Sequence, residues 1–455
     1  MNLNENKTRL CFKNMISSSE VIVNRGKELC IFKKHLSFSG LRKMLSERFL
    51  QIEDYRASGK VKYSLHDFFM SGFAMMYLQD PSLLSFQTRL QTAFNLNNLK
   101  TMFHMDSIPK DTQLRDVLDQ APTDGLKAIF SDYLGQLQRG RHLESFQFLN
   151  GSYLVPLDGS EYFSSKNISC PGCLKKEKPV GDIRYHHQIL QAVIVHPDIK
   201  QVLPLAPEPI QNKDGYTKQD CEINAGKRII SRIREDHPRL KIIITGDGLY
   251  SKQPFIDEVK KAGMSYILVA KPTDHKILFE WVDELNSLGD VQRLEVKNPK
   301  GKTHVYEWIN QVPLNGRSGD VNFFRFRILD KGKITYQNSW VTDIHIDKGN
   351  IRDLVKGGRA RWKIENETFN TLKNQGYHIE HNYGHGTNNL SFIFFMLNLL
   401  AFYTHQILEL TDLLYQRCRQ DFSSRKEFFN QIRCTFRFMV FESWEVMLEK
   451  IIGPP

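Results

Sequence analysis

The sequence predicts an α/β protein, in which a mixed sheet flanked by helices is interrupted by a β insertion and lies between helical N- and C-terminal regions. Three observations support this prediction. Apolar residues recur at helical spacing before residue 150 and after residue 387. Between residues 153 and 270, short apolar runs alternate with helical segments. Residues 296–346 then carry further strand-like runs, at 321–328 and 334–342, joined by a turn.

Length and composition are those of an ordinary globular protein with a sizeable core. The chain has 455 residues, of which 41% are hydrophobic and 25% charged, and this suits two or three domains. Its seven cysteines are mostly scattered, which fits a reducing cytoplasm better than a disulfide framework. The polar opening lacks the apolar segment of a secretory signal. The most apolar stretch, Leu390–Tyr403, has about fourteen residues and is too short to cross a bilayer, so we expect a buried helix and no membrane partner.

The formal charge of +11 is concentrated near the N-terminus. Residues 1–50 hold ten Lys and Arg against four Asp and Glu, a net of +6. Short helices are predicted after them, at 107–118 and 125–139, separated by a break at Pro122. We therefore expect a helical, basic DNA-binding region. The alternative is a basic tail that serves solubility only.

The central segment predicts a specific strand order. Three hairpin-linked strands are followed by a helix, a strand, a helix and a strand, over residues 153–158, 188–195, 201–206, 218–234, 241–248, 254–262 and 265–270. This succession is typical of an RNase H-like fold, in which the fourth strand lies beside the first. Asp158 and Asp247 end those two strands, so we expect them to lie close together. Each also precedes a glycine, and an Asp-Gly pair is commonly just a turn.

A third acid, Glu365, lies in a run that reads as one helix, residues 358–373. Glu365 shares a helical stripe with Phe369 and Leu372, and a carboxylate facing a core needs a partner. That partner is either Arg361, four residues earlier, or a metal ion. Two aspartates and a glutamate facing one cleft can hold two Mg²⁺ ions, with Mn²⁺ as a substitute, and such a pair promotes in-line displacement at phosphorus.

These three segments resemble the catalytic motifs of bacterial insertion-sequence DDE transposases, in the branch with a β insertion and a Tyr-Arg-Glu-Lys signature. The matching runs are Leu157-Asp-Gly-Ser160, Thr245-Gly-Asp-Gly-Leu-Tyr250 and Arg361-Trp-Lys-Ile-Glu365. The resemblance implies an RNase H-like core with Asp158, Asp247 and Glu365 as catalytic metal ligands. It also implies an endonuclease and strand transferase that nicks DNA at terminal inverted repeats and joins the freed 3′-hydroxyl ends to target DNA.

Further expectations follow from the same resemblance. The partners would be double-stranded DNA, as element ends and as target, and a second copy of the chain in the DNA complex. The place of action would be the prokaryotic cytoplasm, at the nucleoid. Two alternatives stay open: an RNase H-like nuclease without strand transfer, and a catalytically inactive DNA-end-binding protein.

The third motif departs from the family pattern at two positions. The family's tyrosine falls on Gly358, and its lysine falls on Leu372 whereas this chain has Lys373. Either the helix register differs locally, or the ligand is Glu367. With Glu365 as the ligand, Arg361, Trp362 and Lys373 are candidates for DNA contacts, and ordinary solvated helix charge is the alternative for the two cations.

Two further signals lie outside the three motifs. Cys170 and Cys173 have the spacing of half a zinc site, with His186, His187 or Cys221 as possible further ligands, although a reduced surface turn has the same pattern. Trp340, in the insertion, is a candidate for stacking on an extruded DNA base; a core tryptophan is the alternative. Glu208, Asp220 and Glu222 are expected to be solvated acids near a helix start.

The predicted domain organisation has five parts. These are a DNA-binding region at 1–150, the first part of the catalytic core at 151–295, the β insertion at 296–346, the core helix with the third acid at 347–386, and a helical C-terminal region at 387–455.

Overall fold

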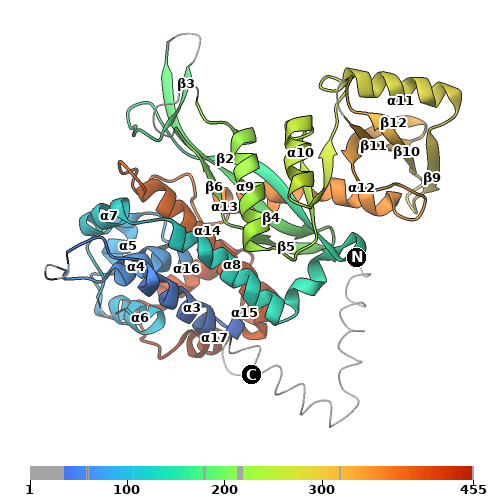
Figure 1. The fold of residues 1–455 in the computed structure, drawn as a ribbon. Helices are drawn as coiled ribbons and strands as arrows, with labels where there is room; N and C mark the ends of the chain where they lie inside the picture. The colour runs from blue at the N-terminus through green and yellow to red at the C-terminus, as the bar shows by residue number, and fades with distance from the viewer. Residues whose placement is uncertain are drawn as a thin grey trace, which may run out of the picture.

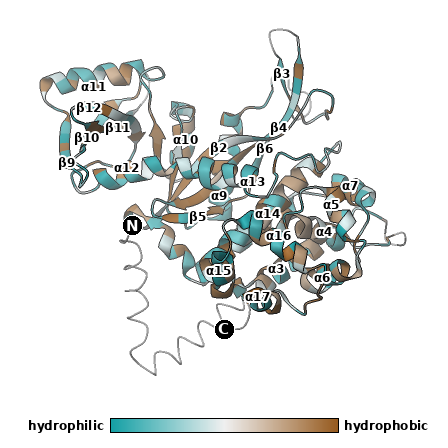
Figure 2. Cartoon of the chain, turned by 180° about the vertical axis from the view of Figure 1, so that it is seen from behind, coloured by the Kyte–Doolittle hydropathy of each residue, from teal (hydrophilic) through white to brown (hydrophobic). Residues whose placement is uncertain are grey.

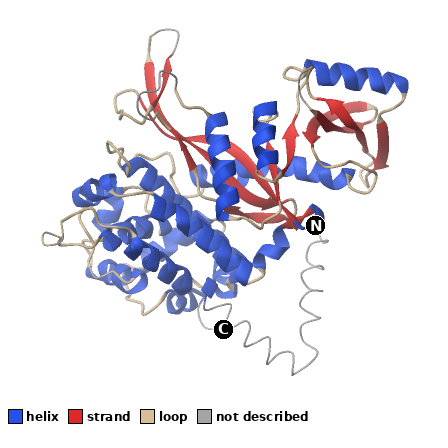
Figure 3. Ribbon diagram, viewed as in Figure 1, coloured by secondary structure: helices blue, strands red, loops and turns tan. Residues whose placement is uncertain are grey.

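The computed structural model describes residues 35–57, 59, 61–105, 107–177, 181–212, 219–316 and 319–452. The most basic part of the predicted DNA-binding region, residues 1–34, lies outside the described residues. Figure 1 shows three parts: a helical body, a central sheet with helices on its faces, and an insertion at the far end of that sheet. Figure 3 shows that the body is helical, whereas the strands lie in the central sheet and the insertion.

The central sheet has the predicted order. Its strands are β2 (Ser152–Ser165), β4 (Ile183–His196), β5 (Ile199–Pro204), β7 (Ile242–Gly246) and β8 (Ser265–Val269). β4 lies antiparallel between β5 and β2, while β2, β7 and β8 run parallel, so the order is β5-β4-β2-β7-β8. All five residues of β7 are buried, as expected for a strand between two parallel neighbours with both faces covered. The RNase H-like fold predicted from the sequence is confirmed.

Short strands also pair with β4 and β2. β3 (Leu174–Glu177) and β6 (Glu208–Ile210) both pair with β4, and β1 (Gln147–Phe148), which lies between the 3₁₀ turns His142–Phe146 and Leu149–Gly151, pairs with β2. β3 and the start of β4 form an arm that projects from the sheet (Figure 1). The arm is largely hydrophilic, whereas the strands at the centre of the sheet are hydrophobic (Figure 2).

The insertion is larger than predicted. It contains α11 (Lys276–Leu288), β9 (Gln292–Lys297), β10 (Thr303–Pro313), β11 (Asp320–Asp330) and β12 (Lys333–Thr342). Its strands continue the central sheet, because β12 pairs with β8 through Trp340 and Val269. α11, which precedes the predicted boundary at residue 296, packs on the insertion strand β10.

The helices at the two ends of the chain form one body instead of two separate regions. Its members are α3 (Phe38–Gln51), α4 (Leu65–Tyr77), α5 (Leu83–Arg89), α6 (Ala93–Phe103), α7 (Asp111–Gln120), α8 (Asp124–Arg139), α14 (Leu390–Thr411), α15 (Leu413–Gln420), α16 (Arg425–Thr435) and α17 (Trp444–Ile452). Trp444 lies against Phe38 and Tyr77, with ring centroids 4.8 and 5.1 Å away. The carboxylate of Asp119 accepts hydrogen bonds from backbone N–H groups just before and at the start of α14.

α14 is the buried helix expected from its apolar sequence. It is longer than predicted, with 22 residues, and is the one helix among the described residues that is long and apolar enough to cross a membrane by those criteria alone. Over the most apolar part of α14, 94% of the residues are buried inside the protein. Contacts with α4, α7, α8 and β5 account for that burial.

The two faces of the sheet are covered by different helices. α9 (Glu222–Asp236) and α10 (Gln253–Lys261) lie on one face, and α12 (Ile351–Ala360) lies on the other. On β8, Ile267 lies where a side chain at Gly357 of α12 would contact it. The next residue, Leu268, lies beside Tyr250, and the ring of Tyr250 contacts Phe255 of α10. Successive residues of a strand point to opposite faces, so α12 and α10 lie on opposite sides.

Gly358 on α12 is required by a close contact with the insertion. A β-carbon at Gly358 would lie 2.7 Å from Nε1 of Trp340, which is fully buried and stacked on Phe324 at 5.2 Å between ring centroids. The indole therefore occupies the space that a side chain at residue 358 would need. This explains why the tyrosine of the related signature is missing here.

Gly358→Ala is expected to lower the free energy of unfolding by about 1–3 kcal/mol, because the added methyl group collides with a packed indole. The matched change is Gly135→Ala in α8, where the new carbon would meet only Nη1 of Arg139 at 3.7 Å. There, helix propensity should leave stability unchanged or raise it by up to about 1 kcal/mol. Urea unfolding of both variants checks this, and equal effects would contradict the proposed contact.

Candidate active site

Asp158 and Asp247 lie beside each other because β2 and β7 are parallel neighbours. The register pairs Pro156 with Thr245, and two further residues along each strand bring the two aspartates together. Asp158 shares its strand face with Leu154, which lies under α12, so both acids face the α12 side of the sheet. The prediction that Asp158 ends its strand is wrong. β2 continues to Ser165, because β4 still pairs with it after β7 has ended.

The charge of Asp158 is strongly disfavoured by its surroundings. Burial and the neighbouring carboxylates of Glu365, Glu222 and Asp247 raise the pKa of Asp158 from 3.8 to about 7, although Arg361 opposes the shift. Three other carboxylates thus act on the charge of Asp158, and a single guanidinium offsets them. Carboxylate oxygens with excess negative charge are the donor set that Mg²⁺ or Mn²⁺ prefers, so the residues present fit a divalent-metal site.

Glu365 reaches this cluster from the helical segment that follows the insertion in the chain. Its Oε1 lies 2.7 Å from Nη2 of Arg361, and its side chain is half exposed. The ion pair considered from the sequence is therefore present. It does not exclude a metal, because the charge of Glu365 is also close enough to raise the pKa of Asp158.

Glu367, the alternative third ligand, faces elsewhere. It lines a different cavity, of about 380 Å³, together with Lys200 and Arg425. Burial lowers the pKa of Lys363, and the nearby charge of Glu367 partly offsets this shift. Glu367 is not among the charges that shift the pKa of Asp158. The geometry supports Glu365 as the third acid.

A π-helical turn accounts for the displaced lysine. Residues Ile364–Phe369 form this turn between α12 and α13 (Asn370–Asn374), and a π turn accommodates one residue more than an α turn. Lys373 therefore follows Glu365 by eight residues while Leu372 stays fully buried. Of the two explanations left open by the sequence, the local change of register is the one observed. The Lys373 ammonium pairs with Glu380 at 2.8 Å, on the surface.

A fourth acid, Glu222, also lies near the site, although its side chain was expected from the sequence to be solvated. It is the first residue of α9, and its carboxylate accepts a hydrogen bond of 2.5 Å from the buried hydroxyl of Tyr250 and another from the backbone N–H of Gly159. Burial raises the pKa of Glu222, with a further contribution from Asp247. A β-carbon at Gly159 would lie only 2.3 Å from Oε2 of Glu222, so this glycine makes room for a carboxylate.

The other two acids near α9 have a structural role. Glu208 is buried and bonded to both Arg228 and Arg232, at 2.6 Å each, and Asp220 also pairs with Arg228. The expectation that they are solvated is therefore wrong. Arg228 and Arg232 lie four residues apart and therefore on one face of α9, which was the signal in the sequence for such a network.

The two tryptophans predicted to contact DNA differ in exposure. Trp340 is 0% exposed in the core of the insertion, so it offers no face to a base in this structure, and the core alternative applies. Trp362 is 44% exposed beside Arg361 and stays a candidate. Cys170 and Cys173 lie away from the acids and meet His187 and His385, not His186 or Cys221.

The strand order and the acids from β2, β7 and the helix after the insertion define an RNase H-like protein. Residues 209–403 match the family model of the transposase DDE domain, a segment that contains Asp247 and Glu365. The chain thus carries a DDE transposase domain, as its three motifs predicted; Asp158 lies before the matched segment. No curated protein matches the chain.

The crowded carboxylates predict a stability gain on neutralising Asp158. Because its pKa is raised from 3.8 to about 7, the folded protein disfavours the charge, and this penalty is absent below pH 3.8 and complete above pH 7. Asp158→Asn should therefore raise the free energy of unfolding of the metal-free protein by about 2 kcal/mol at pH 8. Urea unfolding in EDTA should show the gain shrinking as the pH falls through 7 towards 4. A gain that is independent of pH would contradict the repulsion.

Proposed function

We propose that this protein is the DDE transposase of a bacterial insertion sequence. In this proposal it nicks DNA at terminal inverted repeats and joins the 3′-hydroxyl ends to target DNA. The observation that carries the proposal is the convergence of Asp158, Asp247 and Glu365 on one face of an RNase H-like sheet. The match of residues 209–403 to the transposase DDE domain supports it.

The acids have distinct positions relative to the reaction. Asp158, Asp247 and Glu365 would hold the divalent ions, and the charges of Asp247 and Glu365 both act on Asp158. Bound there, Mg²⁺ or Mn²⁺ would activate the attacking oxygen and stabilise the leaving oxygen at phosphorus. Glu222 keeps its carboxylate oriented through the Tyr250 hydroxyl and supports the site from the opposite face of the sheet. Arg361, Trp362 and Lys373 would contact the DNA beside the acids in this proposal.

A basic surface lies on α12, the helix that precedes Glu365 in the chain. Arg352, Lys356 and Arg359 recur at i, i+4 and i+7 and are exposed on one face of the helix. They line a groove of about 560 Å³ together with Trp362 and the rings of Tyr306 and Phe326. The guanidinium of Arg359 lies 5.0 Å from the ring centroid of Tyr336. Cations interleaved with aromatic rings suit a DNA backbone, and we propose that this surface, hereafter the α12 groove, guides DNA to the acids.

The remaining parts of the proposal follow from this function. Two chains would act together, because two DNA ends must be paired, and the protein would act at the nucleoid in the cytoplasm. A plasmid carrying the coding region and its flanking DNA is the appropriate substrate. The expected result is nicking at the flanks that needs Mg²⁺ or Mn²⁺, followed by joining of a pre-cut end to target plasmid. Nicking without joining would show a nuclease, and end binding without nicking would show an inactive DNA-binding protein.

The third acid is tested by a matched pair of variants. Glu365→Gln should reduce nicking by at least about 100-fold, because changes outside a metal's ligand shell already cost about 10–100-fold. Glu367→Gln, on the same turn but facing another cavity, should retain nicking within a few-fold. Rates are measured on supercoiled plasmid at saturating Mg²⁺. The opposite ranking would assign Glu367 as the ligand.

The α12 groove is tested by salt dependence. Arg352→Ala should weaken binding to DNA of any sequence and reduce the slope of log affinity against log salt by about 1, the loss of one phosphate contact. The control is Lys261→Ala at the end of α10, an exposed lysine on the opposite side of the sheet. Fluorescence anisotropy with a labelled duplex across a salt series measures both slopes. Equal slopes for the two variants would place the DNA elsewhere.

A further inference from the structure

Four metal-binding side chains meet away from the acids. Cys170 and Cys173 come from the loop between β2 and β3, His187 from β4, and His385 from the segment that leads into α14. Their ligand atoms all lie within 4.8 Å of one another. A tight turn, in which the Cys173 N–H donates to the Cys170 carbonyl at 3.1 Å, brings the two thiols to the same side. We name these four residues the Cys₂His₂ cluster.

The distances within the cluster are those of ligands around a tetrahedral zinc ion. The two sulfurs are 3.8 Å apart, and the sulfur–nitrogen distances are 3.4 Å for Cys170–His187 and 3.6 Å for Cys173 with each histidine. Zinc bonds of 2.3 Å to sulfur and 2.0–2.1 Å to nitrogen at the tetrahedral angle give ligand separations of about 3.8 and about 3.6 Å. The sulfurs are also too far apart for a disulfide, and both cysteines are free.

Burial favours the same assignment. Cys173, His187 and His385 are 2%, 7% and 8% exposed, so their polar atoms have little access to water. His186, the sequence neighbour of His187, points to the other side of β4, where its ring lies 4.0 Å from Glu161. Only one of the two adjacent histidines therefore reaches the thiols.

We propose that the Cys₂His₂ cluster is a structural zinc site that fastens the segment after the Glu365 helix to β4, the neighbour of the strand that carries Asp158, and to the loop after that strand. Four protein ligands close the coordination sphere, which is typical of structural and not of catalytic zinc. The site joins residues as far apart as Cys173 and His385, separated by 212 positions in the chain. Cross-linking such a distant pair removes much conformational entropy from the unfolded chain.

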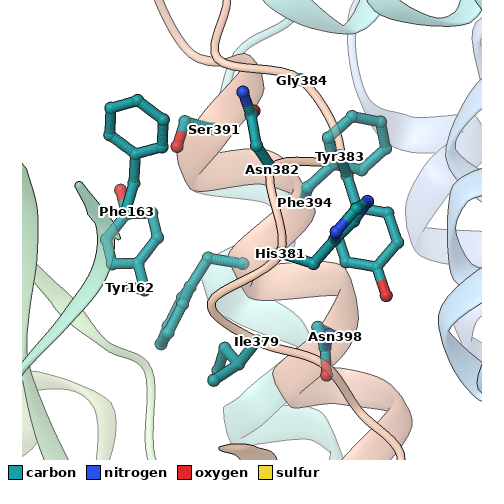
Figure 4. Close-up of a pocket in the computed structure, with 11 residues that line it drawn as sticks. Tyr162, Phe163, Ile379, His381, Asn382, Tyr383, Gly384, Ser391, Phe394 and Asn398 are labelled. Atoms are coloured by element: carbon teal, nitrogen blue, oxygen red, sulfur yellow. The ribbon is translucent and has the colours of Figure 1, made fainter. Parts of the chain in front are cut away.

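The surroundings show what the site would hold in place. The ring of Phe163, five residues after Asp158 on β2, lies 4.2 Å from the ring centroid of His385. Figure 4 shows the adjoining segment Ile379–Gly384 running beside α14, with Tyr162 and Phe163 of β2 next to it. The cavity between them measures about 20 Å³, room for about one water molecule and not for a ligand. This interface is therefore packing that the zinc site would secure.

The test is the metal content of the full-length protein, purified without added metal or chelator. We expect one zinc per chain by elemental analysis. After replacement with Co²⁺, we expect the absorption of thiolate-to-cobalt charge transfer and tetrahedral d–d bands. A zinc-free protein, or a cobalt protein without the thiolate band, would overturn the proposal. Both measurements use the unaltered chain, so they do not depend on whether a variant folds.

Matched variants locate the site. Cys170→Ser and His385→Asn should lose the zinc, whereas Cys221→Ser and His186→Asn, the other ligand candidates suggested by the sequence, should keep one zinc per chain. Loss of zinc should also expose residues 375–389 to limited proteolysis, a readout that needs no transposase activity. Retention of zinc in Cys170→Ser and His385→Asn alike would overturn the proposal, whatever the outcome of the DNA assays.

Discussion

The candidate active site depends on the parallel pairing of β2 and β7. That register alone brings Asp158 to Asp247, although a helix and four strands separate β2 from β7 along the chain. The pairing also gives the sheet two covered faces, so that the π turn after α12 can present Glu365 from one side while α9 presents Glu222 from the other. A slip of one residue would turn every side chain of β2 to the opposite face and separate the acids.

Electrostatic repulsion is the second constraint on the site. Four carboxyl groups gathered near one guanidinium are held together against their own charge, which is why the pKa of Asp158 rises so far. This repulsion destabilises the metal-free protein and favours the binding of a divalent cation. Proteins commonly lose some stability at sites that their function requires. The Arg361–Glu365 ion pair and the Tyr250–Glu222 hydrogen bond limit this cost while leaving the acids in place.

Two local irregularities make the third motif compatible with this fold. Gly358 lets α12 pack directly on the indole of Trp340, so the insertion and the helix of Glu365 share one core. The π turn then restores the register, keeping Leu372 in the core and Lys373 at the surface. π turns of this kind often occur at functional sites, where the energetic cost of the irregular turn is tolerated for the position of a side chain. Both departures from the related signature thus have a structural cause in this chain.

Local patterns in the sequence determined much of this protein. Apolar periodicity predicted the strand order, the buried helix α14 and the helices α7 and α8. The three candidate acids were predicted from two Asp-Gly pairs that follow apolar runs and from a glutamate in a helical run. Contacts between distant residues were decided only by the tertiary structure: the role of Glu222, the burial of Trp340, the choice of His187 and His385 as partners of the two thiols, and the joining of both chain ends in one helical body. The physical reason is that periodicity reports which face of an element is buried, whereas the residue that covers that face is set by packing across the whole chain.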